Sequence, residues 1–324
     1  MSCVQCHGAL YHGNAPMSVR NVTNYAVSVF SRLKNLSRVK GLPFQRLLMR
    51  YAIERFLYRL GCSPVTGNFV LKGGNLFIVW QQGDTARTTM DSDFLFFGDA
   101  SEEHLKTIFA EIALNRLCPE DGMRYVAESI EAFPIRQDTE YGGTRITMDA
   151  FLGTARIPML FDIGVGDAIT PAPVEIDFPV LLPLPVPRLR TYPAVTSIAE
   201  KMENMLIREM DNSRMKDFYD VWLLSILFSY DFCELQRAIQ NTLRRRGTVI
   251  PVKIPVTFTD TFGNNTIKQI QWKAFLRKSN LGDAPKDLQV VIDRLASFIL
   301  PVFQQDMRKT IWNPLLGCWE EKHD

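Results

Sequence analysis

The sequence predicts an α+β fold, with an N-terminal α/β domain built on a mixed sheet and a C-terminal domain that is mainly α-helical. Alternating, strand-like segments interrupt the order of helices and strands in the first half, which favours a mixed sheet over a doubly wound one. The stretch 171–193 is rich in proline and indicates an extended crossing between domains. After this stretch, apolar residues recur at helical spacing. We expect the two domains to span 17–190 and 191–324.

The expected α/β domain begins with helices and continues with strands. Apolar residues at helical spacing after Pro43 predict an amphipathic helix that ends near Gly61. The short apolar run Phe69–Leu71 predicts a buried strand, which enters a turn at a glycine pair. In chain order, the expected elements are helices at 21–36 and 43–60, a strand at 69–71, a short helix at 75–80, a strand at 91–97, a helix at 101–117, and strands at 123–133, 144–151 and 157–163.

The second half is expected to be helical from residue 194 onward. Asp211 to Ser213 supply a turn and a cap between two helices. The segment 250–262 is expected to be extended. In chain order, the expected helices are 194–210, 214–229, 231–246, 269–278 and 286–303.

The charge of the chain is nearly balanced but unevenly distributed. The whole chain of 324 residues carries a net charge of +2, whereas residues 241–290 hold nine Lys and Arg against three Asp, a net +6. A basic stretch of this kind is compatible with a nucleic-acid surface and equally with a solvated basic face. On the first interpretation, Trp272 is available to stack on a base.

Composition argues against several classes of protein. The six cysteines show no framework spacing, which indicates reduced thiols and a cytoplasmic location. Val221–Tyr230 is the most apolar stretch and is too short to cross a bilayer, so no membrane association is expected. Only His104 of the four histidines lies in the body of the fold, which argues against a His-based triad or zinc site. Residues 1–16 contain a CxxCH pattern, but without an export signal we expect a disordered extension.

A glycine pair followed by two aspartates is the most informative feature of the chain. Gly73-Gly74 follows a buried strand, and such a turn lets backbone N–H groups approach a phosphate. Asp91 and Asp93 are two residues apart on one strand, so both side chains point to the same face. Their apolar neighbours imply burial, and paired buried carboxylates need a cation. Asp162 on a later strand completes a triad suited to two Mg²⁺ or Mn²⁺ ions.

Four motifs occur in order along the chain: Phe69-Val-Leu-Lys-Gly-Gly74, Arg87-Thr-Thr-Met-Asp-Ser-Asp93, Ala199-Glu-Lys-Met-Glu203 and Ser213-Arg-Met-Lys-Asp-Phe-Tyr-Asp220. The order of glycine pair, Asp-x-Asp and third acid resembles the DNA polymerase β-like nucleotidyltransferase superfamily. The four motifs jointly resemble the narrower AbiEii/AbiGii toxin family, which includes the MenT nucleotidyltransferase toxins. The resemblance covers residues 17–320.

The resemblance implies a role for each matching residue. Asp91, Asp93, Lys201 and Asp217 are implied to be catalytic, and Asp91, Asp93 and Asp162 to bind metal. The residues implied to contact the nucleotide are Lys72, Gly73, Gly74, Asn75, Arg87, Glu200, Arg214 and Lys216. Asn75 departs from the Thr or Ser usual in the family, which predicts an altered nucleotide preference. Lys216 and Asp220 are four residues apart and are equally compatible with a surface salt bridge.

The implied activity is a metal-dependent nucleotidyltransferase, which uses two metal ions to move a nucleoside monophosphate from an NTP to an acceptor. The resemblance further implies a toxin of a toxin–antitoxin or phage-defence system, an RNA acceptor such as the 3′ end of tRNA, and a cognate antitoxin. Two alternatives remain open at this point. The acceptor of the nucleotide or of a phosphoryl group is a protein side chain, or the chain is a non-catalytic NTP-binding module.

Overall fold

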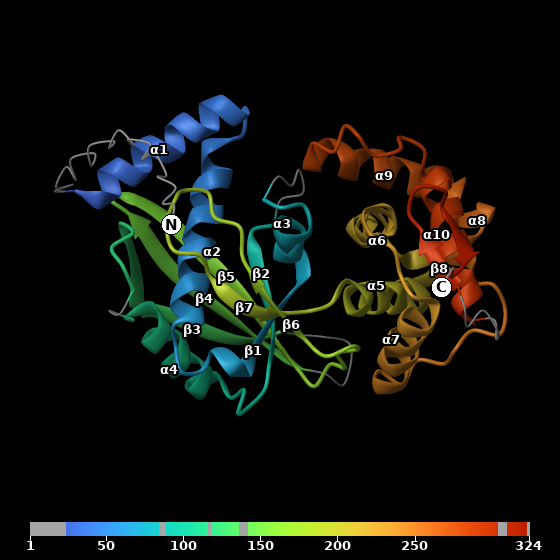
Figure 1. The fold of residues 1–324 in the computed structure, drawn as a ribbon, viewed down its shortest axis with the longest axis horizontal. Coiled ribbons are helices and arrows are strands. Elements are labelled where there is room, and N and C mark those ends of the chain that lie inside the picture. Colours follow the sequence, from blue (N-terminus) through green and yellow to red (C-terminus); the bar gives the residue numbers. More distant parts are fainter. Residues whose placement is uncertain (1–23, 84–88, 116–117, 136–141, 304–309, 323–324) are drawn as a thin grey trace, which may run out of the picture.

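The structure is a computed structural model, and it describes residues 24–83, 89–115, 118–135, 142–303 and 310–322 (Figure 1). The expected extension 1–16 and Arg87 lie outside these residues. A seven-stranded mixed sheet forms the N-terminal half, and helices form most of the C-terminal half. This arrangement confirms the α+β class. Within the described part of the chain, no helix is both long and apolar enough to span a membrane.

The sheet has the strand order β3-β4-β5-β2-β1-β7-β6. The pairs β2/β5 and β1/β7 are parallel, and the other neighbouring pairs are antiparallel. The mixed sheet predicted from the interrupted alternation is therefore present. The strands are β1 (Phe69–Lys72), β2 (Asp91–Phe96), β3 (Met123–Ile135), β4 (Gly143–Leu152), β5 (Ala155–Val165), β6 (Val174–Asp177) and β7 (Arg188–Thr191).

Two helices pack against the sheet through aromatic side chains. Phe56 of α2 (Phe44–Gly61) stacks on Phe109 of α4 (Glu102–Ala113), with 5.5 Å between ring centroids. Both rings contact Phe161 of β5, and all three are almost fully buried. The first helix, α1 (Tyr25–Lys40), packs on α2. These contacts cover one face of the sheet and leave its charged residues on the other.

The helical half has a hydrophobic cluster of its own, centred on side chains of α5, α6, α7 and α10. Phe77 of α3 (Leu76–Trp80), which follows β1, belongs to this cluster and so joins the two halves. The remaining elements are α5 (Ala194–Arg208), α6 (Met215–Leu227), α7 (Phe232–Arg245), α8 (Asp260–Gly263), α9 (Thr266–Ser279), α10 (Leu288–Phe303), and a C-terminal hairpin of β8 (Thr310–Asn313) and β9 (Cys318–Glu321).

Two expectations about secondary structure were wrong. The proline-rich stretch is more than a crossing, because it folds into the hairpin β6/β7 and adds two strands to the sheet. Its prolines flank these strands and do not interrupt them, so both ladders keep their N–H donors. The segment 250–262, which was expected to be extended, instead forms the 3₁₀ turn Val256–Phe258 and the short helix α8. Helix α8 begins after Thr259, whose backbone carbonyl accepts hydrogen bonds from the backbone N–H groups of Phe262 and Gly263.

Candidate active site

Four charged side chains form a row across four neighbouring strands of the sheet. Lys72 of β1 is opposite Asp93 of β2, which is opposite Asp162 of β5. Arg145 of β4 lies on the other side of Asp162. Residues that are opposite one another in a ladder share a face of the sheet. The row therefore places two acids between two cations, on the face away from α2 and α4.

Asp91, Asp93 and Asp162 come together as the sequence predicted. One carboxylate oxygen of each residue lies within 4.8 Å of the other two, and all three residues are partly buried. The hydroxyl group of Thr89 donates a short hydrogen bond to the Asp91 carboxylate, which fixes its orientation. Three oxygen donors at this separation suit a hard divalent cation such as Mg²⁺.

The electrostatics of this acidic cluster also favour a cation. The pKa of Asp93 is raised to about 6, chiefly by burial and then by the negative charge of Asp91. Asp162 raises it further, whereas Lys72 and Lys216 lower it. A buried carboxyl group that resists ionisation is short of positive charge, which a divalent ion supplies.

Arg145 holds Asp162 in place with two hydrogen bonds. Its Nε and Nη2 atoms donate to Oδ1 and Oδ2 of Asp162, each at 2.8 Å. Because each carboxylate oxygen keeps a second lone pair, this fork leaves Asp162 able to bind a metal ion. Arg145 was missed in the sequence, since only the pairing register of β4 and β5 shows that it faces Asp162.

The glycine turn lies directly against the acidic cluster. Gly73 has φ of +72°, and a β-carbon built on it would stand 1.8 Å from Oδ2 of Asp93. Only glycine fits this conformation at this distance. Asn75 ties the turn to β2, because its amide nitrogen donates to the Asp91 carbonyl at 3.1 Å and to Ser92 Oγ at 2.9 Å. The side-chain N–H groups of Asn75 are thus engaged, and its contact with a nucleotide stays a prediction.

Lys72 joins the sheet to the helical half through a network of ion pairs. Its Nζ lies 2.6 Å from Asp167, in the loop after β5, and 3.4 Å from Glu200 of α5. The hydroxyl group of Tyr192 donates to the same Glu200 oxygen at 3.2 Å. Burial opposes the charge on Lys72, but Glu200 and Asp167 raise its pKa above the ordinary value. Lys72 and Glu200, two predicted site residues, are therefore in direct contact.

Arg246 completes this network from the end of α7. Its guanidinium lies 3.2 Å from Asp167, 3.4 Å from Glu200 and 2.9 Å from Glu203. Burial would raise the pKa of Asp167, but the charges of Lys72 and Arg246 outweigh it and lower that pKa to about 2. Sequence reasoning missed Asp167 and Arg246, which lie outside the four motifs. The only signal was the arginine run 244–246 at the end of a predicted helix.

A second cluster of ion pairs lies between α5 and α6. Lys201 Nζ stands 3.0 Å from Asp217 and 2.7 Å from Asp220, and both acids are almost fully buried. Arg214 Nε donates to the other oxygen of Asp217 at 2.7 Å. The structure thus brings together Lys201, Arg214 and Asp217 of the predicted site. Their position gives them a part in holding the two helices together, and their catalytic roles stay predictions.

Lys216 is close enough for its charge to act on Asp93, and it does not pair with Asp220. The structure corrects the suggested Lys216–Asp220 bridge, because Asp220 bonds to Lys201. Lys216 is exposed at the start of α6, and its charge is felt by Asp93 across the gap between the halves. Within the described residues it forms no ion pair. It is therefore an exposed cation that no ion pair of the described residues neutralises.

The basic segment 241–290 does not form one continuous surface. Arg246 belongs to the buried network above, and Lys268 is buried with its Nζ on the Asn212 carbonyl at 3.0 Å. Trp272 is fully buried, and its indole N–H donates to the Pro285 carbonyl at 2.8 Å. The expectation that Trp272 stacks on a base is therefore wrong. Lys273, Arg277 and Lys286 remain exposed around one cavity.

Comparisons with known proteins relate the chain to one family and to two solved structures. The family model for the nucleotidyl transferase AbiEii toxin of type IV TA systems matches residues 55–294. The crystal structure of JHP933 from Helicobacter pylori is similar at 12% identity and a TM-score of 0.45, covering 82% of this chain and 94% of that one. A candidate nucleotidyltransferase from H. pylori is similar at 13% identity and a TM-score of 0.43, covering 81% and 99%. No curated protein matches the chain.

Proposed function

This chain belongs to the AbiEii family of nucleotidyl transferase toxins, and on this premise we propose that it transfers a nucleoside monophosphate from an NTP to RNA in a metal-dependent reaction. The acceptor we propose is the 3′ end of tRNA. The observation that carries the proposal is the contact between the glycine turn and the acidic cluster. Gly73 lies against Asp93, so a phosphate held by the turn would also be within reach of cations bound by the three carboxylates.

The three carboxylates are proposed to hold the divalent cations. Mg²⁺ or Mn²⁺ bound there would activate the attacking hydroxyl and neutralise charge on the leaving pyrophosphate. Asp91, Asp93 and Asp162 supply the oxygen ligands, while Thr89 and Arg145 fix the orientation of two of them. The role of the protein is thus to position the triphosphate and to present the three acids to the cations, whose charge would keep the acids ionised.

The triphosphate is proposed to lie between the two halves of the molecule. The turn Gly73–Asn75 offers backbone N–H groups from the sheet, and Lys216 offers an exposed cation from α6. Lys72 is held by Asp167 and Glu200, so in this arrangement it positions the turn that follows it. Arg214 is half-exposed just before the same end of α6, where it pairs with Asp217.

The family description also supports an antitoxin as the biological partner. We propose that the chain is the toxin of a toxin–antitoxin pair that acts in phage defence. Its toxicity would follow from the transfer reaction, because a modified tRNA 3′ end no longer accepts an amino acid. Expression of the wild-type chain and of an Asp91→Asn variant in cells without the antitoxin tests this. Equal growth arrest by the wild-type chain and by the Asp91→Asn variant would contradict toxicity through catalysis.

The decisive biochemical experiment incubates the protein with each α-labelled NTP, Mg²⁺ and total tRNA. We expect label in RNA from one or two NTPs, and none with Asp91→Asn or in the presence of EDTA. Label in a protein band would favour the protein-acceptor alternative, since the same site acts on the phosphate whatever the acceptor. An absence of label in both RNA and protein, for all four NTPs and Mn²⁺ as well as Mg²⁺, would overturn the proposal.

A further inference from the structure

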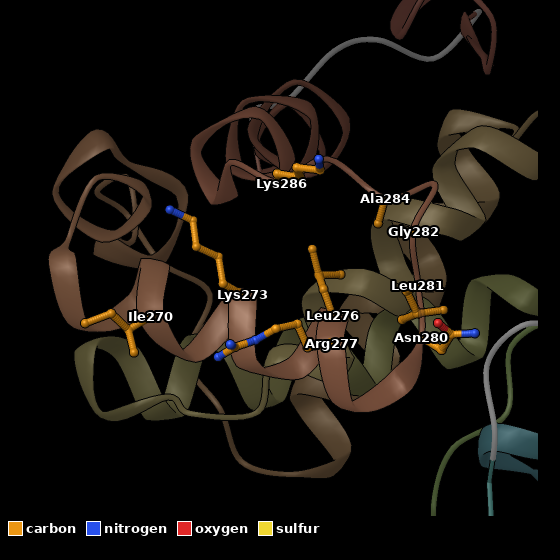
Figure 2. Close-up of a pocket in the computed structure, with 9 residues that line it drawn as sticks. All are labelled: Ile270, Lys273, Leu276, Arg277, Asn280, Leu281, Gly282, Ala284 and Lys286. Atoms are coloured by element: carbon orange, nitrogen blue, oxygen red, sulfur yellow. The ribbon is translucent and has the colours of Figure 1, made fainter.

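A cavity of about 680 Å³ lies beside the C-terminal part of α9, outside the acidic site (Figure 2). Its base is aliphatic, with Leu276 pointing into the opening and Leu281 and Ala284 at one end. Three cations surround this base. In this view Lys286 lies above the opening, Lys273 lies to its left and Arg277 lies below it, and the remaining lining residues are Ile270, Asn280 and Gly282.

The lining of the cavity suits a ligand that has an apolar part and carries negative charge. None of the nine lining residues has a carboxylate, so the three positive charges are not neutralised within the cavity wall. Its volume lies in the range of small-molecule sites. An unstacked base presents an apolar face that an aliphatic surface and an Arg guanidinium can cover, and the phosphates on either side of it pair with cations.

The cavity is connected to the acidic site through α6. Helix α9 packs on α6, and Lys268 of α9 bonds to the Asn212 carbonyl just before α6 begins. The first turn of α6 carries Lys216, whose charge reaches Asp93. Lys216 of α6 and the cavity residues Lys273 and Arg277 of α9 therefore lie on two helices that are in contact.

We propose that this cavity, the α9 cavity, binds one unpaired nucleotide of the RNA acceptor, with the base on Leu276, Leu281 and Ala284 and its flanking phosphates on Lys273, Arg277 and Lys286. The inference rests on the proposed RNA acceptor and adds the place where that RNA is held away from the reacting end. Contacts with phosphates supply affinity that depends on salt but little on sequence. The α9 cavity thus determines binding of the acceptor and leaves binding of the NTP unchanged.

The test compares the double variant Lys273→Ala/Arg277→Ala with the control Lys278→Ala. Lys278 is an exposed cation on the same helix that does not line the cavity. Binding of a fluorescein-labelled single-stranded RNA of twelve nucleotides is measured by anisotropy between 50 and 200 mM KCl. We expect Kd to rise about tenfold or more in the double variant, and the slope of log K against log salt to fall by about 0.7 for each cation removed.

Steady-state transfer to tRNA supplies the second readout. The double variant should raise KM for tRNA while KM for the NTP and kcat at saturating tRNA stay as in wild type. Ala284→Leu, which fills the cavity and keeps its charges, should raise KM for tRNA as well. Thermal melting of each variant confirms that it folds.

The outcomes separate this inference from the proposed function. If the wild type labels tRNA and the double variant binds RNA with unchanged Kd and salt slope, the α9 cavity is not an RNA site. If the double variant keeps RNA binding but loses binding to an acidic amphipathic peptide, the α9 cavity docks a protein and the inference is overturned. If the wild type labels no RNA at all, the proposed function fails first, and the anisotropy measurement still tests the α9 cavity.

Discussion

Gly73 is packed so closely against Asp93 that a β-carbon at residue 73 would stand 1.8 Å from Oδ2 of Asp93. The turn proposed to bind phosphate and the strand proposed to bind metal are thus packed directly against each other. A side chain at residue 73 would have to displace Asp93 or shift the turn. Gly73 also has a left-handed backbone conformation, which residues with a side chain rarely adopt.

Gly73→Ala tests this contact. The added methyl group must displace the carboxylate of Asp93 or shift the turn, and a displacement of about 1 Å costs roughly 100-fold in rate. We expect kcat/KM to fall by at least about that factor in the labelled-NTP assay. Gly67→Ala is the matched control, since nothing lies within 4 Å of a β-carbon there and activity should be unchanged. Wild-type activity in Gly73→Ala would show that the turn does not constrain Asp93.

Asp91→Asn tests whether the acidic cluster is built for a cation. The amide keeps an oxygen acceptor for Thr89 but removes one of three like charges within 4.8 Å. Without divalent ions we expect the variant to be more stable than wild type by on the order of 1 kcal/mol, because repulsion is relieved. With Mn²⁺ the order should reverse, since a metal ion stabilises the folded state that binds it. Calorimetry with and without Mn²⁺ measures both, and equal stabilisation of the two proteins by Mn²⁺ would refute the site.

Lys201→Met tests the cluster between α5 and α6. The substitution leaves Asp217 and Asp220 buried with one cation fewer, and breaking a buried pair in this way costs about 3–5 kcal/mol. We expect a loss of this size in urea unfolding. Lys106→Ala is the control, since its ion pair with Glu103 is on the surface and its removal should not change stability measurably. Full stability with lost activity would instead assign Lys201 a direct role at the nucleotide.

The pH dependence of stability follows from Asp217. Burial opposes its ionisation, but Lys201 and Arg214 lower its pKa from 3.8 to about 2. A lowered pKa in the folded state means that the stabilisation is complete above about pH 4 and is lost as the pH falls toward 2. The shift corresponds to about 2 kcal/mol. The difference in unfolding free energy between wild type and Asp217→Asn should therefore shrink from pH 6 to pH 3. A difference that stays constant would show that Asp217 is not held ionised by its neighbours.

Local patterns predicted the parts of the fold that depend on neighbouring residues. The glycine pair, the apolar residues that flank Asp91 and Asp93, and the helical spacing after residue 194 are such patterns, and each gave the observed element within a few residues. The hairpin β6/β7 could not be found in this way, because prolines mask strands that lie between them. The same holds for the C-terminal hairpin β8/β9, whose strands are only four residues long.

The candidate site was predictable only where a motif carried it. The proximity of Asp162 to Asp91 and Asp93 came from the order of acids along the chain. Arg145 could not be found, because the partner of a strand residue is determined by the pairing register, which one sequence does not reveal. Arg246 reaches its acidic partners from the end of α7, and such long-range contacts depend on how helices pack.

The connection between the two halves is short and tightly packed. β7 ends at Thr191 and α5 begins at Ala194, and between them Tyr192 is fully buried with its hydroxyl group on Glu200. On the proposed function, a nucleotide would bind between two halves that are already joined. The entropy of bringing the halves together would then be lost when the chain folds and not when the ligand binds. An inhibitor of this protein gains more from matching that fixed spacing than from its own flexibility.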